Sequence, residues 1–167
     1  MNRIWKMSLL ITFLIILDQI TKGVIQSKFY LGESIPVIEG LFNFTYVRNP
    51  GAAFGFMAQA SLVVRQILFL WIPVGACLWL ISLIWKTRND NAIGCLAYSL
   101  IFAGAVGNLI DRFSMGYVVD FLDFYWGKSH FPAFNVADSA ITVGAFFMII
   151  DMINDYKKKA SEKMPTA

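Results

Sequence analysis

Two apolar runs decide the fold class of this chain: ILFLWIPVGACLWLISLIW at Ile67–Trp85 and AIGCLAYSLIFAGAVGNLI at Ala92–Ile110. Each run has 19 residues and contains no charged side chain. A helix rises about 1.5 Å per residue, so either run is long enough to cross a hydrocarbon core about 30 Å thick. We therefore expect two membrane-spanning helices here, joined by a short loop.

Two further apolar runs, Ile4–Ile25 and Ala133–Ile153, have similar lengths and contain only three and two charged residues, respectively. Arg3 and Lys6 precede the apolar core of the first run, as in a secretory signal peptide, but no cleavage site of small residues follows. We expect this run to be retained as a span. The sequence thus predicts a mainly α-helical, polytopic membrane protein with four transmembrane helices, in one domain over residues 1–167.

The composition agrees with this class. Of the 167 residues, 57% are hydrophobic and 15% are charged, whereas soluble domains have about 45–50% apolar and about 25% charged residues. Nothing in the sequence indicates a nucleic-acid partner, because the net charge is only +3 and no basic patch accompanies a nucleic-acid-binding motif. Cys77 and Cys95 lie inside apolar runs and His130 is the single histidine, so we expect no disulfide, no metal site and no cofactor.

The distribution of lysine and arginine predicts the sidedness. With four spans, both termini and the middle loop lie on one side. That side carries eight cations: Arg3, Lys6, Lys86, Arg88, Lys157, Lys158, Lys159 and Lys163. The other two loops carry five: Lys28, Arg48, Arg65, Arg112 and Lys128. Basic residues close to span ends favour the cytoplasmic side, so we expect cytoplasmic termini and two long outer loops.

The outer loops contain signals of secondary structure. Leu41–Val47 alternates aromatic with polar or β-branched residues, and Gly116–Tyr125 is rich in β-branched and aromatic residues. Both patterns are typical of strands, so we expect a small outer β-sheet, or cradle, built from both loops. Ala53–Val64 is interpreted as a short interfacial helix with Phe54, Met57 and Leu62 facing lipid.

Acidic residues at membrane depth are the strongest functional signal, because such groups usually face a protein interior or a wet cavity. Counted along the chain, five charged residues fall near the outer interface: Asp18, Asp111, Arg112, Asp120 and Asp138. If Asp120 and Asp138 share a site, repulsion between them lets the pair hold one proton, as in aspartic proteases. The alternative is structural: Asp138 serves as a helix cap, and Asp18 and Lys22 neutralise each other.

Other functional classes remain open at this point. A small transporter or proton-conducting subunit would use Asp18, Asp120 and Asp138 as an ion path, although no inverted repeat is visible. A lipid-binding scaffold is a third alternative. A serine hydrolase would need His130 beside Ser129 or Ser139, and neither serine lies in a nucleophile-elbow pattern.

Five motifs carry a resemblance to a known family. In chain order they are LDQITK (Leu17–Lys22), VRNPGAAFG (Val47–Gly55), GNLIDR (Gly107–Arg112), VVDF (Val118–Phe121) and FNVADS (Phe134–Ser139). Together they make the chain resemble the bacterial lipoprotein signal peptidase (signal peptidase II) family. The resemblance covers nearly the full chain.

The resemblance implies an aspartic endopeptidase of the bacterial cytoplasmic (inner) membrane, active near the outer face, that works as a monomer without a metal or cofactor. Its substrate would be a prolipoprotein signal peptide followed by a diacylglyceryl-modified cysteine, in contact with membrane lipids. By match to the family's motifs, Asp120 and Asp138 would be catalytic. The substrate-binding or supporting residues would be Asn49, Gly51, Asn108, Arg112, Asn135, Asp18 and Lys22.

Overall fold

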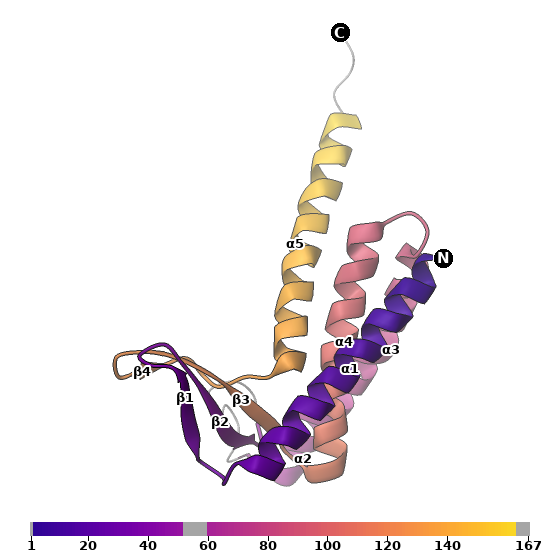
Figure 1. The fold of residues 1–167 in the computed structure, drawn as a ribbon. Coiled ribbons are helices and arrows are strands. Elements are labelled where there is room, and N and C mark those ends of the chain that lie inside the picture. The colour runs from indigo at the N-terminus through magenta and orange to yellow at the C-terminus, as the bar shows by residue number, and fades with distance from the viewer. Residues whose placement is uncertain (1, 52–59, 163–167) are drawn as a thin grey trace.

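The computed structural model describes residues 2–51 and 60–162 as a bundle of long helices with a small sheet at one end (Figure 1). The elements, in chain order, are α1 (Arg3–Lys28), β1 (Ser34–Ile38), β2 (Phe42–Asn49), α2 (Leu62–Gln66), the π-helical turn η2 (Ile67–Trp71), α3 (Ile72–Thr87), α4 (Ala92–Met115), β3 (Val118–Trp126), β4 (Ser129–His130) and α5 (Val136–Glu162). The start of α1 and the end of α5 both lie at the end of the bundle away from the sheet.

Four helical stretches are long and apolar enough to cross a membrane: Arg3–Lys28, Leu62–Thr87, Ala92–Met115 and Val136–Ser161. The prediction of four transmembrane helices is thereby confirmed. The second stretch joins α2, η2 and α3 without a break, and the side chain of Ser61 caps its start by accepting a hydrogen bond from the backbone N–H of Val64. Leu62–Val64, the predicted end of the interfacial helix, therefore open this long helix. The rest of that predicted helix falls largely on residues 52–59, outside the described residues.

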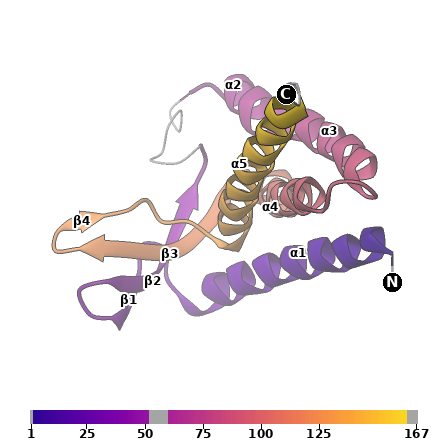
Figure 2. The same cartoon turned by 90° about the horizontal axis from the view of Figure 1, so that it is seen from above.

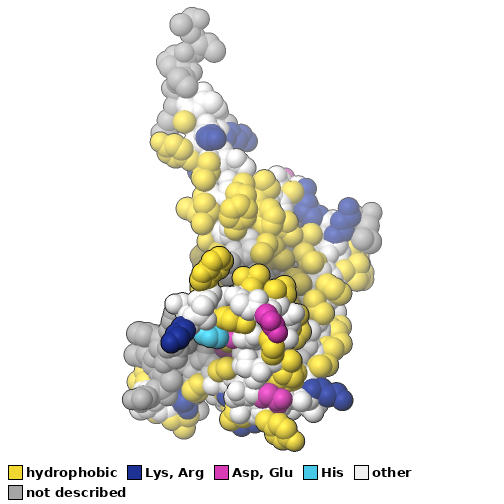
Figure 3. Space-filling view, turned by 60° about the vertical axis from the view of Figure 1, so that its left-hand side comes forward, with side chains coloured by type: hydrophobic (Ala, Val, Ile, Leu, Met, Phe, Trp, Pro, Cys, Tyr) yellow, Lys and Arg dark blue, Asp and Glu magenta, His cyan; other side chains and the backbone are white. Residues whose placement is uncertain are grey.

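The exterior of the bundle is apolar, as a lipid-facing surface requires. Leu78 and Trp79 on α3 are 66% and 65% exposed, and Phe146 on α5 is 61% exposed. Hydrophobic side chains cover the helical body in the space-filling view (Figure 3). A soluble monomer rarely exposes such a continuous apolar surface, so the chain is a multi-pass membrane protein.

Helix α4 is the centre of the bundle and contacts α1, α3 and α5 (Figure 2). Small residues let it approach α5 closely: Gly104 packs against the backbone carbonyl of Ala137, and Gly144 of α5 packs against Ile101. Close backbone approach through small residues is a general mode of helix association in membranes. The α4–α5 contact consequently sets the position of the first turn of α5.

The sheet is antiparallel with the order β1-β2-β3-β4. The two predicted strands correspond to β2 and β3, and the prediction of a small sheet built from both loops is confirmed. In the β2–β3 register Asn49 lies opposite Val118, and Val47 lies opposite Asp120. Strands β1 and β4 were not expected, because Ser34–Gly40 contains a proline and Trp126–His130 is short and polar.

A compact apolar cluster fastens the sheet to the bundle. It consists of Ile25 at the end of α1, Tyr46 of β2, and Val119 and Phe121 of β3. Gly116, with a φ of 78°, ends α4 in the left-handed region that only glycine adopts readily and turns the chain into β3. Strand β3 therefore passes directly across the ends of α1 and α4.

We predict that Gly104→Ala destabilises the bundle by about 1–3 kcal/mol, because the new methyl group would collide with the rigid backbone at Ala137. Thermal unfolding in detergent, followed by tryptophan fluorescence, measures the effect. Gly75→Ala in α3 is the matched control, because a Cβ at Gly75 meets nothing within 4 Å. Equal melting temperatures for Gly104→Ala and the parent would contradict this packing.

Candidate active site

Asp120 of β3 and Asp138 of α5 line the same cavity, which has a volume of about 530 Å³. Three more of the predicted residues line it: Asn49, Asn108 and Arg112. Its remaining lining is mostly apolar: Val118, Phe131, Pro132, Ala133, Phe134, Ser139, Ile141, Thr142 and Val143. The cavity therefore lies between the sheet and the first two turns of α5, with a few polar groups in an apolar wall.

The first turn of α5 places Asp138. The side chain of Asn135 accepts a hydrogen bond from the backbone N–H of Asp138 at 2.9 Å, as an N-cap residue does. Asp18 of α1 accepts another from the backbone N–H of Ala137, also at 2.9 Å. Two of the free N–H groups at the helix start are thus satisfied from outside the helix, and Asp138 is held at a fixed position.

Three side-chain amides orient the two carboxylates. Asn135 and Asn49 donate to the two oxygens of Asp120, at 2.8 and 3.0 Å. Asn108 donates to Oδ1 of Asp138 at 2.7 Å. Asn108 also accepts hydrogen bonds through its own oxygen, from Lys22 at 3.1 Å and from Asn135 at 3.2 Å. The amide of Asn108 therefore connects Lys22 with Asp138 directly and with Asp120 through Asn135.

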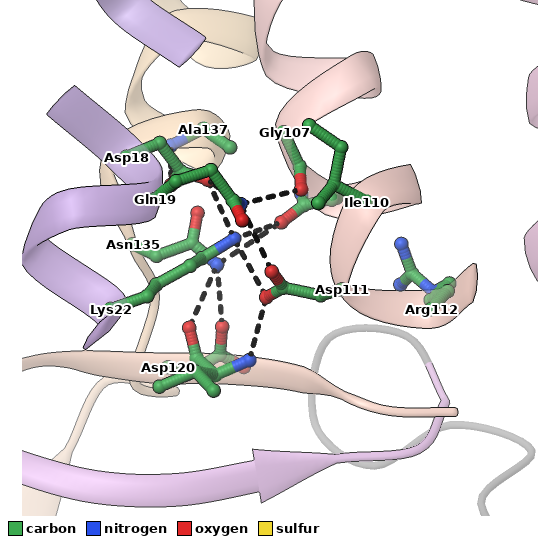
Figure 4. Close-up of polar contacts among 12 residues, drawn as sticks. Asp18, Gln19, Lys22, Gly107, Ile110, Asp111, Arg112, Asp120, Asn135 and Ala137 are labelled. Carbon is green, nitrogen blue, oxygen red and sulfur yellow. Dashed lines mark hydrogen bonds and ion pairs between the residues drawn. The ribbon is translucent and has the colours of Figure 1, made fainter. Parts of the chain in front are cut away.

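Behind this layer lies a buried cation, Lys22, whose side chain is only 2% exposed. Its Nζ contacts Asp18 at 2.8 Å, Asp111 at 2.9 Å and the oxygen of Asn108 at 3.1 Å (Figure 4). An ammonium group has three N–H donors, so all three are used. Asp111 in turn accepts from the backbone N–H of Val119 at 3.1 Å and from Gln19 at 3.0 Å. The network joins α1, α4 and β3.

Sequence reasoning missed Asp111 and Gln19 as members of this network. Both residues lie inside the motifs quoted above: Asp111 precedes Arg112, and Gln19 follows Asp18. The sequence gives these positions but does not indicate which neighbours the side chains contact. A signal was available: Asp111 lies one residue beyond the apolar part of its span and Lys22 is the one cation inside the first span near that level. Intramembrane charges usually pair.

Arg112 holds the loop that follows β2. Its guanidinium donates to the carbonyl of Gly51 at 3.2 Å and lies 5.7 Å from the ring centre of Phe69. The backbone N–H of Gly51 donates to the side chain of Asn49 at 3.0 Å. The Nε of Arg112 is buried and has no hydrogen-bond partner among the described residues. Gly51 is therefore hydrogen-bonded to two residues that line the cavity, Asn49 and Arg112.

The environment of Asp120 favours its protonated form. Burial is the main cause and the negative charge of Asp138 the second, and together they raise the pKa of Asp120 from 3.8 to about 7. The amides of Asn49 and Asn135 and the charge of Lys22 offset part of this rise. A carboxyl group with this pKa exchanges a proton readily at neutral pH, as general acid–base catalysis requires.

The structure gives His130 a different partner from the serines considered above. Its Nδ1 lies 2.9 Å from Asp123, and its ring stacks on Tyr125. Ser139 lines the cavity of the two aspartates instead. Among residues 2–51 and 60–162, no group of three or more histidine, cysteine or acidic side chains has the arrangement of a metal site.

The fold and the site together define the class as a multi-pass membrane protein in which two aspartates line one cavity. Comparisons with known proteins identify a single family. The family model of signal peptidase (SPase) II matches residues 10–154. The chain belongs to the signal peptidase II family, and it is therefore a peptidase.

Two individual proteins that are similar to this chain belong to the same family. A lipoprotein signal peptidase of Syntrophus aciditrophicus is 47% identical over 87% of this chain and 91% of the relative. One from Geobacter sulfurreducens is 49% identical over 87% of this chain and 90% of the relative. A bacterial membrane enzyme solved by the in meso method at 2.3 Å resolution shares 34% identity, with a TM-score of 0.82 over 99% of this chain and 96% of that chain.

We predict that Lys22→Met destabilises the protein by about 3–5 kcal/mol, because it leaves Asp18 and Asp111 as buried carboxylates without their cation. Thermal unfolding in detergent is the measurement. Lys28→Met at the exposed end of the same helix is the matched control and should unfold like the parent. If the two variants lose equal stability, the buried ion pairs of Lys22 do not stabilise the fold more than an exposed lysine does.

Proposed function

We propose that this protein is an aspartic endopeptidase of the bacterial cytoplasmic membrane. It removes the signal peptide from prolipoproteins by cleaving before a diacylglyceryl-modified cysteine. The family membership supports the substrate class. The observation that carries the aspartic mechanism is the meeting of Asp120 and Asp138 in one cavity, each oriented by amide donors, with the pKa of Asp120 raised to about 7.

The two carboxyl groups share one proton in the resting site and exchange roles during the reaction. The ionised carboxylate takes a proton from water, and the resulting hydroxide oxygen bonds to the scissile carbonyl carbon. The protonated carboxyl gives its proton to the carbonyl oxygen, which produces a neutral tetrahedral diol. As this diol collapses, the C–N bond breaks, the protonated member of the pair gives its proton to the departing cysteine nitrogen, and the ionised member takes a proton from a diol hydroxyl. The signal peptide leaves with a new carboxyl group.

Residues around the pair orient the substrate backbone. Ile141, Thr142 and Val143 extend the cavity along α5, so a signal helix lying in the membrane fits beside α5 with its end at Asp138. Arg112 lines the same cavity and can donate hydrogen bonds from its planar guanidinium to backbone carbonyls of the bound substrate. We place Asn49 and Gly51 at the rim of the cavity, because Asn49 lines it and Gly51 is hydrogen-bonded to both Asn49 and Arg112.

We further propose that the site faces outward and that both termini are cytoplasmic. The excess of lysine and arginine at the termini and in the α3–α4 loop supports this orientation. We also propose that the protein acts as a monomer. The transporter alternative is not favoured, because the relatives are peptidases and the acidic groups of the site form one local network rather than a path.

We predict that Asp120→Asn and Asp138→Asn each lower kcat by about a thousandfold or more, because a positioned proton donor or acceptor contributes about 10²–10⁴-fold. Purified variants are assayed on a lipid-modified precursor by mass spectrometry. Asp155→Asn, at an exposed position of α5, is the matched control. Near-normal turnover by either active-site variant, with a normal melting temperature, would remove that residue from the catalytic pair.

The pH dependence follows from the raised pKa of Asp120. The proton that the pair needs is present below this pKa and leaves as the pH rises through it. We expect kcat/KM to fall above about pH 7, approaching tenfold per pH unit. A profile that stays flat from neutral to alkaline pH would contradict the assignment of Asp120 as the proton carrier.

Recognition of the lipid is a separate prediction. Each buried methylene contributes about 0.8 kcal/mol, so two acyl chains hold the cysteine close to the membrane interface. We expect the diacylglyceryl-modified precursor to be cleaved and the same precursor without lipid to be cleaved at least about a hundredfold more slowly. The two forms are compared in one bilayer preparation with chelator present. Equal rates would indicate a general membrane protease.

A further inference from the structure

A second cavity lies over the sheet. Its volume is about 490 Å³, and it is lined by residues of all four strands and of the segment that follows them: Ser34, Thr45, Val47, Asp123, His130, Phe131, Pro132 and Ala133. The last three residues also line the cavity of the two aspartates. The two cavities therefore adjoin along the Phe131–Ala133 segment.

Hydrogen bonds to β3 fix this shared segment. The backbone N–H of Phe131 donates to the carbonyl of Phe124, and Phe134 exchanges backbone hydrogen bonds with Leu122. The ring of Phe134 also stacks on that of Phe124. The segment thus forms a firm common wall, and a chain that leaves one cavity along it enters the other.

The second cavity contains a histidine that is oriented for binding. Nδ1 of His130 lies 2.9 Å from Oδ1 of Asp123, and Asn43 donates to Oδ2 of the same carboxylate at 2.9 Å. The ring of His130 stacks on Tyr125 with 5.0 Å between centres. A carboxylate beside Nδ1 accepts a hydrogen bond from the N–H of that nitrogen, so Nε2 of the neutral ring is an acceptor. The described residues give Nε2 no partner.

The path of the substrate links the two cavities. With the signal helix beside Ile141–Val143 and the scissile carbonyl at Asp120 and Asp138, the chain beyond the cleaved bond has to leave on the other side of the pair. Phe131–Ala133 is the part of the lining that both cavities share, so it offers this exit. The second cavity combines an apolar wall with the polar groups of Ser34, Thr45, Asp123 and His130. An extended peptide has N–H and C=O groups that can pair with these polar groups, whereas an acyl chain has none.

We propose that the second cavity binds the mature side of the precursor, namely the first few residues after the lipidated cysteine, with Nε2 of His130 accepting a hydrogen bond from a peptide N–H or hydroxyl group. This inference rests on the proposed function and adds a second recognition site to it. It makes cleavage depend on residues that remain on the lipoprotein, beside the signal helix and the lipid.

The test uses two lipid-modified precursors and the full-length protein. The short precursor ends at the cysteine as an amide, and the long one continues for about six serine, glycine and asparagine residues, which extend about 20 Å. The measured quantity is the length preference, defined as kcat/KM of the long precursor divided by that of the short one. We expect a preference of about tenfold for the parent protein, a typical gain from one or two additional hydrogen bonds.

Two variants probe the cavity in different ways. His130→Ala removes the acceptor, and Ser34→Tyr on the exposed edge strand β1 adds bulk to the cavity lining while both members of the His130–Asp123 pair are kept. Each should reduce the length preference about fivefold. Lys128→Ala, in the same β3–β4 turn but outside both cavity linings, is the matched control and should keep the preference. A purely structural effect would lower both rates together and leave the preference unchanged.

The outcomes separate this inference from the proposed function. If the parent cleaves neither precursor, the proposed function fails and the inference fails with it. If the parent cleaves both equally well, the proposed function stands and the mature-side site is refuted. A length preference that survives in either His130→Ala or Ser34→Tyr also refutes the site, whereas its loss in both, with Lys128→Ala unchanged, supports it.

Discussion

The contact of Lys22 with Asp18 and Asp111 is the interaction on which the rest of the site depends. A charge inside the hydrophobic bundle is tolerated only when it is paired and hydrogen-bonded, and Lys22 uses all three donors on Asp18, Asp111 and Asn108. The same carboxylates hold other elements: Asp18 caps α5, and Asp111 binds the backbone of β3 at Val119. One buried cation thus sets the relative positions of α1, α4, α5 and β3, and so of the two candidate catalytic groups.

This arrangement also explains why the pKa of Asp120 is raised. The ion pairs of Lys22 are with Asp18 and Asp111, and the groups that contact Asp120 and Asp138 directly include the neutral amides of Asn49, Asn108 and Asn135. Amides orient a carboxylate but add no positive charge to it. Burial and mutual repulsion therefore prevail at Asp120, and its pKa rises to about 7. Asp18 and Asp111 are thus paired with a cation, whereas amide groups bind Asp120 and Asp138, the two candidate catalytic residues.

Much of this architecture could be predicted from the sequence, because long apolar runs and alternating strands are local patterns. The four helices and strands β2 and β3 are of this kind. Strands β1 and β4 could not be found in this way, since they exist only through pairing with β2 and β3. The same holds for Asp111 and Gln19, whose direction depends on how α1 packs on α4. The predicted site residues lie together around one cavity and in the network behind it.

An infrared titration of the purified protein across neutral pH tests the central claim most directly. The carbonyl stretch of a protonated carboxyl group is separate from the bands of carboxylates and amides, so a proton on a buried aspartic acid is visible. We expect one such band, which disappears as the pH rises through about 7 and is missing from Asp120→Asn. A parent protein without any carboxyl titration near neutral pH, or an Asp120→Asn variant that keeps it, would contradict the account.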